Sequence, residues 1–454
     1  MACPLQSNNT RACNIATLPQ KKKKKDMDTT NTNTSPIVRP DIDWIPSYKV
    51  FKERVQRLAS LPLNRPTTLP RGWPSEITSE RVWSGSDFAS EDDYVVRLTP
   101  SDISEIESAL SFFKSLSSRS PGEGLGPDDV SQSTFPLPTL GPKLEEISNI
   151  IHSGRGFVVL RGLDPDKYSS TDNILLYLGV TSYIAEQRGM QDFDGRMILH
   201  IQAVRKESDV TQHGAMPNSP YVNRAQPFHT DLCDVLSLYA LGVAAYGGES
   251  FLASSAKIYN EIARLRPDVI HVLASDDWPF DEFYKNQYHT RPLLYNFSGT
   301  GRDGEKEVEH GPGFQFSRRP LTGAHFSPHH PLVPAMTEVQ AEALDMVYFL
   351  AKEHALEIQL QKGDMQIFNN FAMLHARSSF VDDEQGQDKK RHMLRLWLRN
   401  EKKAWKSDSE GLEKVGREVY EWETEEWRRE VGTKWDIEQS PPELRVDFKR
   451  ASCA

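Results

Sequence analysis

Residues 228–245 have the sequence FHTDLCDVLSLYALGVAA, in which a short polar segment leads into a long apolar one. His229 and Asp231 are two positions apart, so in extended backbone both side chains point to one face while Thr230 points away. Residues 236–245 are apolar at nearly every position, as in a central strand that is covered on both faces. The stretch therefore predicts a buried strand that is preceded by a His-x-Asp pair.

A histidine and a carboxylate on one face, joined by a distant histidine, form the usual binding set for ferrous iron. Such a set leaves coordination positions open for a cosubstrate and oxygen. The predicted third ligand is His375, in the sequence MLHAR at residues 373–377. A structural zinc site would be expected to use cysteines. A hydrolytic zinc enzyme is a distant alternative, because no candidate general base stands out beside the triad.

The sequence around this pair predicts further strands and flanking helices. Helical periodicity occurs at 143–152, 256–265 and 337–352. Strand-like segments occur at 157–160, 197–204, 356–360, 364–368 and 392–398, with a turn at Gly363. We therefore expect an α+β chain with a β-barrel or β-sandwich core and helices mostly outside it.

Two arginines lie on one face of the last predicted strand. Arg391, Met393 and Arg395 alternate with leucines that face the other side. An arginine inside a barrel is costly unless it is paired. A dicarboxylate cosubstrate would supply that pairing through a bidentate, charge-assisted contact. Ordinary surface ion pairs are the alternative.

Six segments resemble, in the same order, motifs of the taurine dioxygenase (TauD/TfdA-like) family of iron(II)/2-oxoglutarate dioxygenases. That family includes the γ-butyrobetaine hydroxylases. The segments are 156–163, 228–231, 247–250, 319–323, 362–377 and 391–395. The resemblance implies a double-stranded β-helix (jelly-roll) barrel with flanking helices. It also implies a large insertion, residues 255–355, between the metal-ligand strands.

The resemblance also implies roles for single residues. The implied iron ligands are His229, Asp231 and His375, the implied 2-oxoglutarate contacts are Ser250 and Arg391, and the implied substrate contact is Arg395. The loop before Arg391 is longer than in the taurine enzymes. The two arginines could therefore exchange roles.

The implied reaction oxidises, and most simply hydroxylates, a C–H bond of a small, anionic organic substrate. Fe(II) is the metal, 2-oxoglutarate and O2 are consumed, and succinate and CO2 are released. One alternative is a non-heme iron oxidase of the same fold that performs desaturation or cyclisation, or that does not use 2-oxoglutarate. A second is a non-catalytic member that uses the barrel for binding.

The composition limits the classes of binding partner and the cellular compartment that we expect. The net charge of −10 argues against a general nucleic-acid binder. The longest apolar run, near residues 236–246, is about half of what a bilayer requires, so no membrane segment is expected. Three of the four cysteines lie in expected tails, which favours a reducing compartment and a cytoplasmic location. A homo-oligomer is compatible with the sequence.

The chain divides into four predicted regions. They are a disordered tail at 1–42, an N-terminal extension with a Ser/Pro/Gly-rich loop at 43–142, the dioxygenase domain at 143–400 and a C-terminal helical extension at 401–454. The lysine run 21–25 could be a nuclear address, but a solvated charge run in the tail is the preferred interpretation. By resemblance, both extensions suggest a eukaryotic, fungal protein.

Overall fold

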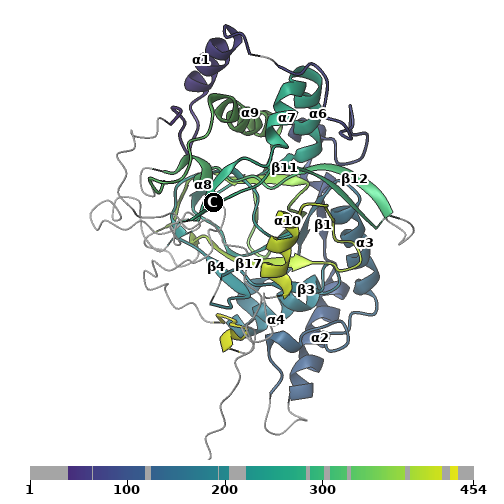
Figure 1. Ribbon diagram of the computed structural model, residues 1–454. Helices are drawn as coiled ribbons and strands as arrows, with labels where there is room; N and C mark the ends of the chain where they lie inside the picture. Colours follow the sequence, from purple (N-terminus) through teal and green to yellow (C-terminus); the bar gives the residue numbers. More distant parts are fainter. Residues whose placement is uncertain are drawn as a thin grey trace, which may run out of the picture.

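The computed structural model describes residues 39–63, 65–117, 124–192, 194–203, 221–282, 287–300, 307–324, 329–383, 389–421 and 430–437. These residues form a mixed structure of two main β-sheets with helices on the outer side of each, together with three two-stranded sheets (Figure 1). The lysine run and nearly all of the predicted N-terminal tail lie outside the described residues.

The larger sheet carries the predicted central strand. Its strand order is β1 (Val95–Arg97), β2 (Phe157–Arg161), β14 (Met365–Asn369), β6 (Val235–Gly242), β17 (His392–Arg399) and β3 (Gln187–Gly189), and β4 (Ile198–Ile201) also pairs with β17. β6 pairs with β14 on one side and with β17 on the other, both antiparallel. The prediction of a central strand after the His-x-Asp pair is therefore confirmed.

The smaller sheet carries the two histidines of the predicted metal site. Its order is β13 (Leu356–Ile358), β8 (Ser250–Ser254), β15 (Met373–Arg377) and β5 (Gln226–His229), and every pairing is antiparallel. Its inner face and that of the larger sheet share one apolar core. Leu252 and Ile358 of the smaller sheet lie there with Phe368 and Trp397 of the larger sheet.

Helices cover the outer face of each sheet (Figure 1). The larger sheet is covered by α2 (Pro100–Ser117), α3 (Leu140–His152) and α4 (Ser170–Thr181). The smaller sheet is covered by α6 (Ser255–Leu265), α7 (Pro267–Leu273) and α9 (Glu338–His354), and α1 (Tyr48–Ala59) packs on α9. The three predicted helices are confirmed to within a few residues. None of the helices in the described ranges is long and apolar enough to cross a membrane.

The face assignment of β17 is also confirmed. Leu394, Leu396 and Leu398 lie in the core under α3 and α4, while Met393 and Trp397 lie in the core between the sheets. The alternation of the sequence thus places the face that bears Arg395 inside the molecule.

The remaining described elements surround the sheets. They are the short 3-10 helices η1 (Gly85–Asp87), η2 (Glu91–Asp93), η3 (Pro127–Asp129) and η4 (Pro165–Lys167), the strands β7 (Tyr246–Gly247), β9 (Pro279–Asp281), β10 (Tyr288–Thr290), β11 (Leu294–Thr300), β12 (Glu307–Phe314) and β16 (Phe380–Val381), and α8 (Arg319–Thr322), α10 (Glu410–Gly416) and the π-helical η7 (Arg417–Glu421). The predicted insertion, residues 255–355, contains α6 to α9 and β9 to β12.

The turn at Gly363 connects the two sheets. β13 belongs to the smaller sheet and β14 to the larger one. Gly363 has a φ of 91°, and a Cβ there would overlap the carbonyl oxygen of Leu163. Only glycine combines that backbone angle with so close an approach.

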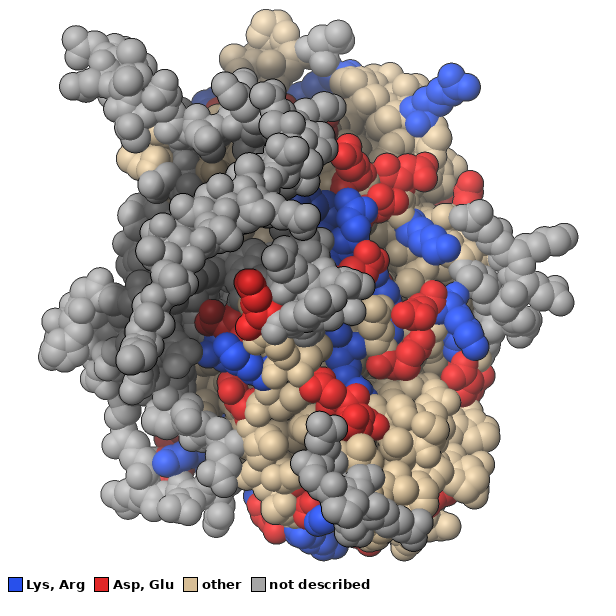
Figure 2. All heavy atoms as spheres, turned by 60° about the horizontal axis from the view of Figure 1, so that its bottom comes forward, with Lys and Arg blue, Asp and Glu red and all other residues tan. Residues whose placement is uncertain are grey.

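Basic and acidic side chains are intermingled on the face shown in Figure 2. The described surface there has no large area of a single sign.

Candidate metal centre

The structure brings His229, Asp231 and His375 together, although the last two are 144 positions apart in the sequence. One potential ligand atom of each lies within 4.8 Å of those of the other two. The cause is strand register, because His375 of β15 is the direct partner of His229 of β5. The two imidazole rings have centroids 4.0 Å apart.

His229 offers one ring nitrogen to a metal. Its Nδ1 lies 2.9 Å from the carbonyl oxygen of Pro227, which can only accept, so Nδ1 carries the hydrogen and Nε2 keeps its lone pair. Burial lowers the pKa of His229, and burial together with the nearby His229 and Arg395 lowers that of His375. Both rings are therefore neutral, which is the form that binds metal.

The two carboxylate oxygens of Asp231 differ in their surroundings. Oδ2 accepts hydrogen bonds from Arg395 Nη1 at 3.0 Å and from Trp397 Nε1 at 3.1 Å. Oδ1 is buried and has no hydrogen-bond partner among the described residues. One oxygen is thus held by the protein, and the other is left for a ligand.

The loop that carries Asp231 is held through its backbone. The Asn370 side chain accepts from the Asp231 N–H at 2.8 Å and donates to the carbonyls of Asp231 and Cys233. Thr230 points away from the site, as predicted, because its Oγ1 accepts from the Phe316 N–H at 2.9 Å.

These donors fit a divalent iron ion. Two neutral imidazoles and one monodentate carboxylate suit Fe(II) and leave positions open for exogenous ligands. The buried Asp231 Oδ1 without a protein partner is the kind of atom that a metal would satisfy. The arrangement can hold a redox-active metal beside a protected interior.

Ser250 and Arg391 lie inside the molecule, beside the space between the sheets. Ser250 Oγ donates to Gln366 Oε1 at 2.8 Å, which connects β8 to β14 of the opposite sheet. Arg391 directly precedes β17 and is buried, and its Nε and Nη1 have no partner in the part of the chain that the structure describes. Burial lowers the pKa of Arg391 to about 10, against the attraction of Asp382.

Gly248 makes room for Arg391. Its φ is 81°, and a Cβ built there would be 3.3 Å from Arg391 Cδ. A side chain at position 248 would therefore be strained and would press on the arginine.

Arg395 lies beside the predicted iron ligand. Its Nε donates to Gln191 Oε1 at 2.8 Å and its Nη1 to Asp231 Oδ2, which leaves Nη2 buried and, among the described residues, without a partner. Two of its three guanidinium nitrogens therefore donate to the protein.

Sequence reasoning missed several residues of this site. They are Gln191, Gln366, Asn370, Arg377 and Trp397. Arg377 and Trp397 could have been found, because each lies two residues beyond a predicted site residue, on the same face of its strand. Gln191 and Asn370 act from loops, and no periodicity points to them.

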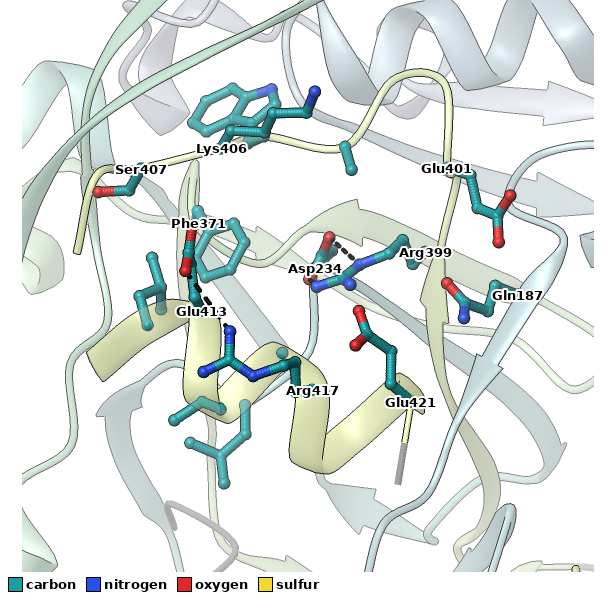
Figure 3. Close-up of a pocket in the computed structure, with 16 residues that line it drawn as sticks. Gln187, Asp234, Phe371, Arg399, Glu401, Lys406, Ser407, Glu413, Arg417 and Glu421 are labelled. Carbon is teal, nitrogen blue, oxygen red and sulfur yellow. Dashed lines mark hydrogen bonds and ion pairs between the residues drawn. The ribbon is translucent and has the colours of Figure 1, made fainter. Parts of the chain in front are cut away.

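A separate cavity of about 580 Å³ lies under α10. Figure 3 shows that Asp234, which pairs with Arg399 of β17, faces it from the side of the larger sheet, while Arg417 and Glu421 face it from η7. None of the three predicted iron ligands lines this cavity. Its mixed charges and partnered side chains give it no clear ligand chemistry.

Comparisons with known proteins point to one family. The family model described as "Taurine catabolism dioxygenase TauD, TfdA family" matches residues 121–397. The taurine hydroxylase-like protein SAT17 of Stachybotrys chartarum is 34% identical over 354 residues, which cover 77% of this chain and 86% of that protein. The FR-33289 synthase of Streptomyces rubellomurinus is 24% identical over 287 residues, 61% of this chain and 78% of that protein.

Two of the solved structures with a similar chain course are iron oxygenases. An asparagine oxygenase in complex with Fe(II), 2S,3S-3-hydroxyasparagine and succinate has 15% identity and a TM-score of 0.48, covering 67% of this chain and 93% of its own. The non-heme iron oxygenase OrfP in complex with Fe and alpha-ketoglutaric acid has 16% identity and a TM-score of 0.47, covering 68% and 94%.

Proposed function

Because the chain belongs to the TauD/TfdA family of non-heme iron dioxygenases, we propose that it hydroxylates a C–H bond of a small, anionic organic substrate. Its cofactor is Fe(II), and its cosubstrates are 2-oxoglutarate and O2. The products of the proposed reaction are the hydroxylated substrate, succinate and CO2.

One observation carries the proposal. The candidate ligand atoms of His229, Asp231 and His375 lie within 4.8 Å of one another, and one Asp231 oxygen has no partner in the described chain. Iron with its cosubstrates supplies the oxidant for a C–H bond. The protein holds the metal on one face, keeps both imidazoles neutral and aims one carboxylate oxygen at it. The apolar core between the sheets excludes water from the reacting groups.

The hydrogen bonds of the two candidate arginines favour Arg391 as the anchor of the far carboxylate of 2-oxoglutarate. Nε and Nη1 of Arg391 have no partner among the described residues and can therefore bind a ligand. Arg395 instead donates to Gln191 and Asp231. The sequence resemblance adds Ser250 to the proposed anchor. Its single hydroxyl hydrogen, which is donated to Gln366 Oε1 in this structure, would turn to the carboxylate when 2-oxoglutarate binds. Arg395 then orients Asp231 and retains Nη2 for an anionic group of the substrate.

The substrate that we propose carries a sulfonate or carboxylate group. Arg395 Nη2 is a buried guanidinium nitrogen beside the candidate metal ligands, which supports an anionic partner. The name of the 34%-identical relative, a taurine hydroxylase-like protein, supports the sulfonate in particular.

The direct test is anaerobic binding of Fe(II) and 2-oxoglutarate, followed through the visible charge-transfer absorbance of the complex. A screen of sulfonates and amino acids should then identify compounds that perturb this band. In aerobic assays, the ratio of succinate formed to substrate lost should be one for hydroxylation. Substrate loss without succinate would instead indicate an oxidase that does not use 2-oxoglutarate. A product that has lost hydrogen but gained no oxygen atom would indicate desaturation or cyclisation.

The variant Asp231→Ala should abolish turnover and iron binding while leaving the fold intact. The reason is that the only carboxylate of the proposed ligand set is removed. Iron stoichiometry, circular dichroism and activity together check this expectation. Asp276→Ala, at an exposed position, is the control and should behave as the wild type does. An active Asp231→Ala enzyme would refute the assignment of the site.

Other features of the protein remain proposals. We propose that the two sheets form a double-stranded β-helix (jelly roll). The division into a tail, an N-terminal extension, a catalytic domain and a C-terminal extension stays a prediction. A cytoplasmic location and a homo-oligomeric state also stay predictions. Gel filtration with light scattering would test the oligomeric state.

A further inference from the structure

Arg377 occupies an interior position that the proposed function has not used. It lies two residues beyond His375 on β15, so both side chains share one face of the strand. Its direct partner in β8 is Ser250, whose hydroxyl group reaches Gln366 of the opposite sheet. Arg377 is only 5% exposed. It therefore lies among the groups proposed to hold the cosubstrate.

One of the three guanidinium nitrogens of Arg377 is bound to the protein. Nη2 donates to the carbonyl oxygens of Val222 at 2.8 Å and of Arg224 at 2.6 Å. Nε and Nη1 are buried and have no hydrogen-bond partner among the residues that the structure places. The two hydrogen bonds of Nη2 brace the 222–224 segment. This bracing gives no role to Nε and Nη1.

Arg391 and Arg377 share one aromatic ring. The guanidinium carbons lie 4.9 Å (Arg377) and 5.5 Å (Arg391) from the centroid of the Phe380 ring. Each guanidinium has Nε and Nη1 buried without a partner within the described ranges. Two cations thus gather at one place, next to the hydroxyl-bearing Ser250.

In the part of the chain that the structure describes, little negative charge balances these two cations. Neither arginine forms an ion pair with a described residue, and the carboxylate that attracts both is the half-buried Asp382. Among the described residues, two buried guanidiniums near one carboxylate lack one negative charge, and the neighbouring guanidinium of Arg224 adds to the positive charge around Arg377. An unpaired buried charge is strongly unfavourable. A single carboxylate can accept hydrogen bonds from two guanidiniums at once, since it has about four acceptor positions.

We propose that Arg377 is a second guanidinium that binds the far carboxylate of 2-oxoglutarate, together with Arg391 and Ser250, while Asp382 balances the remaining charge. This inference rests on the proposed function and deepens it. It predicts that the enzyme selects a dicarboxylic keto acid over a monocarboxylic one through two arginines.

The test compares two keto acids on the variant Arg377→Met. The anaerobic Fe(II) protein is titrated with 2-oxoglutarate and with 2-oxobutyrate, which lacks the far carboxylate, by calorimetry and charge-transfer absorbance. Loss of a charge-assisted contact should weaken 2-oxoglutarate binding about ten- to hundred-fold. Binding of 2-oxobutyrate and of Fe(II) alone should be unchanged.

Two further variants sharpen the test. Asp382→Asn keeps an acceptor for the Arg391 N–H but removes the competing charge, so 2-oxoglutarate should bind several-fold more tightly. Arg155→Met is the matched control, because Arg155 also binds a carbonyl, that of Phe157, and lies over the Phe157 ring, at the start of β2. It should leave both keto acids unaffected.

Each other outcome decides the matter. Unchanged 2-oxoglutarate binding by Arg377→Met would overturn the inference. Equal weakening of both keto acids would also overturn it, because it would show that Arg377 only braces the 222–224 segment. Failure of the wild-type protein to bind 2-oxoglutarate in the presence of Fe(II) would overturn the proposed function and this inference together.

Discussion

The Asp231 carboxylate illustrates how single side chains prepare the candidate site. Oδ2 receives two N–H groups, from Arg395 and Trp397, whereas Oδ1 has no partner in the described chain. Hydrogen bonds to one oxygen fix the orientation of the other. The arginine that resembles a substrate contact therefore also acts on the proposed metal ligand.

The variant Trp397→Phe should weaken iron binding about ten-fold, because one of the two N–H groups that orient Asp231 is lost. Iron affinity is measured anaerobically by competition with a chelator. Trp278→Phe is the control, since Trp278 is equally buried and its Nε1 also donates a hydrogen bond, to the Val272 carbonyl in a remote core. The same iron affinity in both variants would contradict the role given to Trp397.

At the scale of elements, the C-terminal helices support the loop that carries Asp231. Tyr420 of η7 accepts from the Asp234 N–H at 3.0 Å and donates to the Leu398 carbonyl at 2.7 Å. Arg399 lies over the Tyr420 ring at 4.0 Å and pairs with Asp234 at 2.8 Å. Burial raises the pKa of Tyr420 far above its usual value, so its hydroxyl group remains a donor.

The variant Tyr420→Phe should reduce the free energy of unfolding by about 1–3 kcal/mol, because two buried backbone groups lose their partner. It should also weaken iron binding, since Asp234 lies three residues beyond Asp231 in the same loop. Urea unfolding and metal titration measure both effects. Tyr246→Phe, at a side chain that is 77% exposed, should change neither. An unaltered unfolding midpoint in Tyr420→Phe would exclude this support.

At the scale of the whole molecule, buried histidines should make stability depend on pH. Burial lowers the pKa of His152 to about 4, and its Nδ1 lies 2.8 Å from the Ser148 carbonyl. The pKa values of His310 and His329 are also lowered to about 4 by burial. Below about pH 6.5 the unfolded chain binds protons that the folded protein does not. The stabilisation is therefore complete above that pH and declines as the pH falls towards 4.

For His152 alone, this decline should amount to about 2 kcal/mol between about pH 7.5 and pH 5. Urea unfolding of the metal-free wild type and of His152→Gln measures it. The variant should show a pH dependence that is smaller by that amount. Identical dependence in the two proteins would mean that His152 is not responsible.

Much of the architecture could be predicted from local patterns. The 3.6-residue period located α3, α6 and α9, and the alternation of residues 391–398 assigned both faces of β17. The His-x-Asp spacing gave two residues that share a face, and their order with other motifs indicated the family. These patterns can be read without the tertiary structure, because period and spacing are properties of the chain itself.

The tertiary structure decided everything that depends on contacts between distant segments. The turn at Gly363 joins strands of different sheets, which a local pattern cannot distinguish from a hairpin. The register of β15 against β5 places His375 opposite His229, and that of β15 against β8 places Arg377 opposite Ser250.

The sequence by itself therefore determined which residue types could hold iron and which strand faces they occupy. Only the folded chain decided that Arg395 binds Asp231, that Arg391 and Arg377 keep free N–H groups among the described residues, and that Tyr420 supports the loop. The reason is physical. Periodicity is local, whereas the partner of a buried charge is set by strand register and packing between segments far apart in the chain.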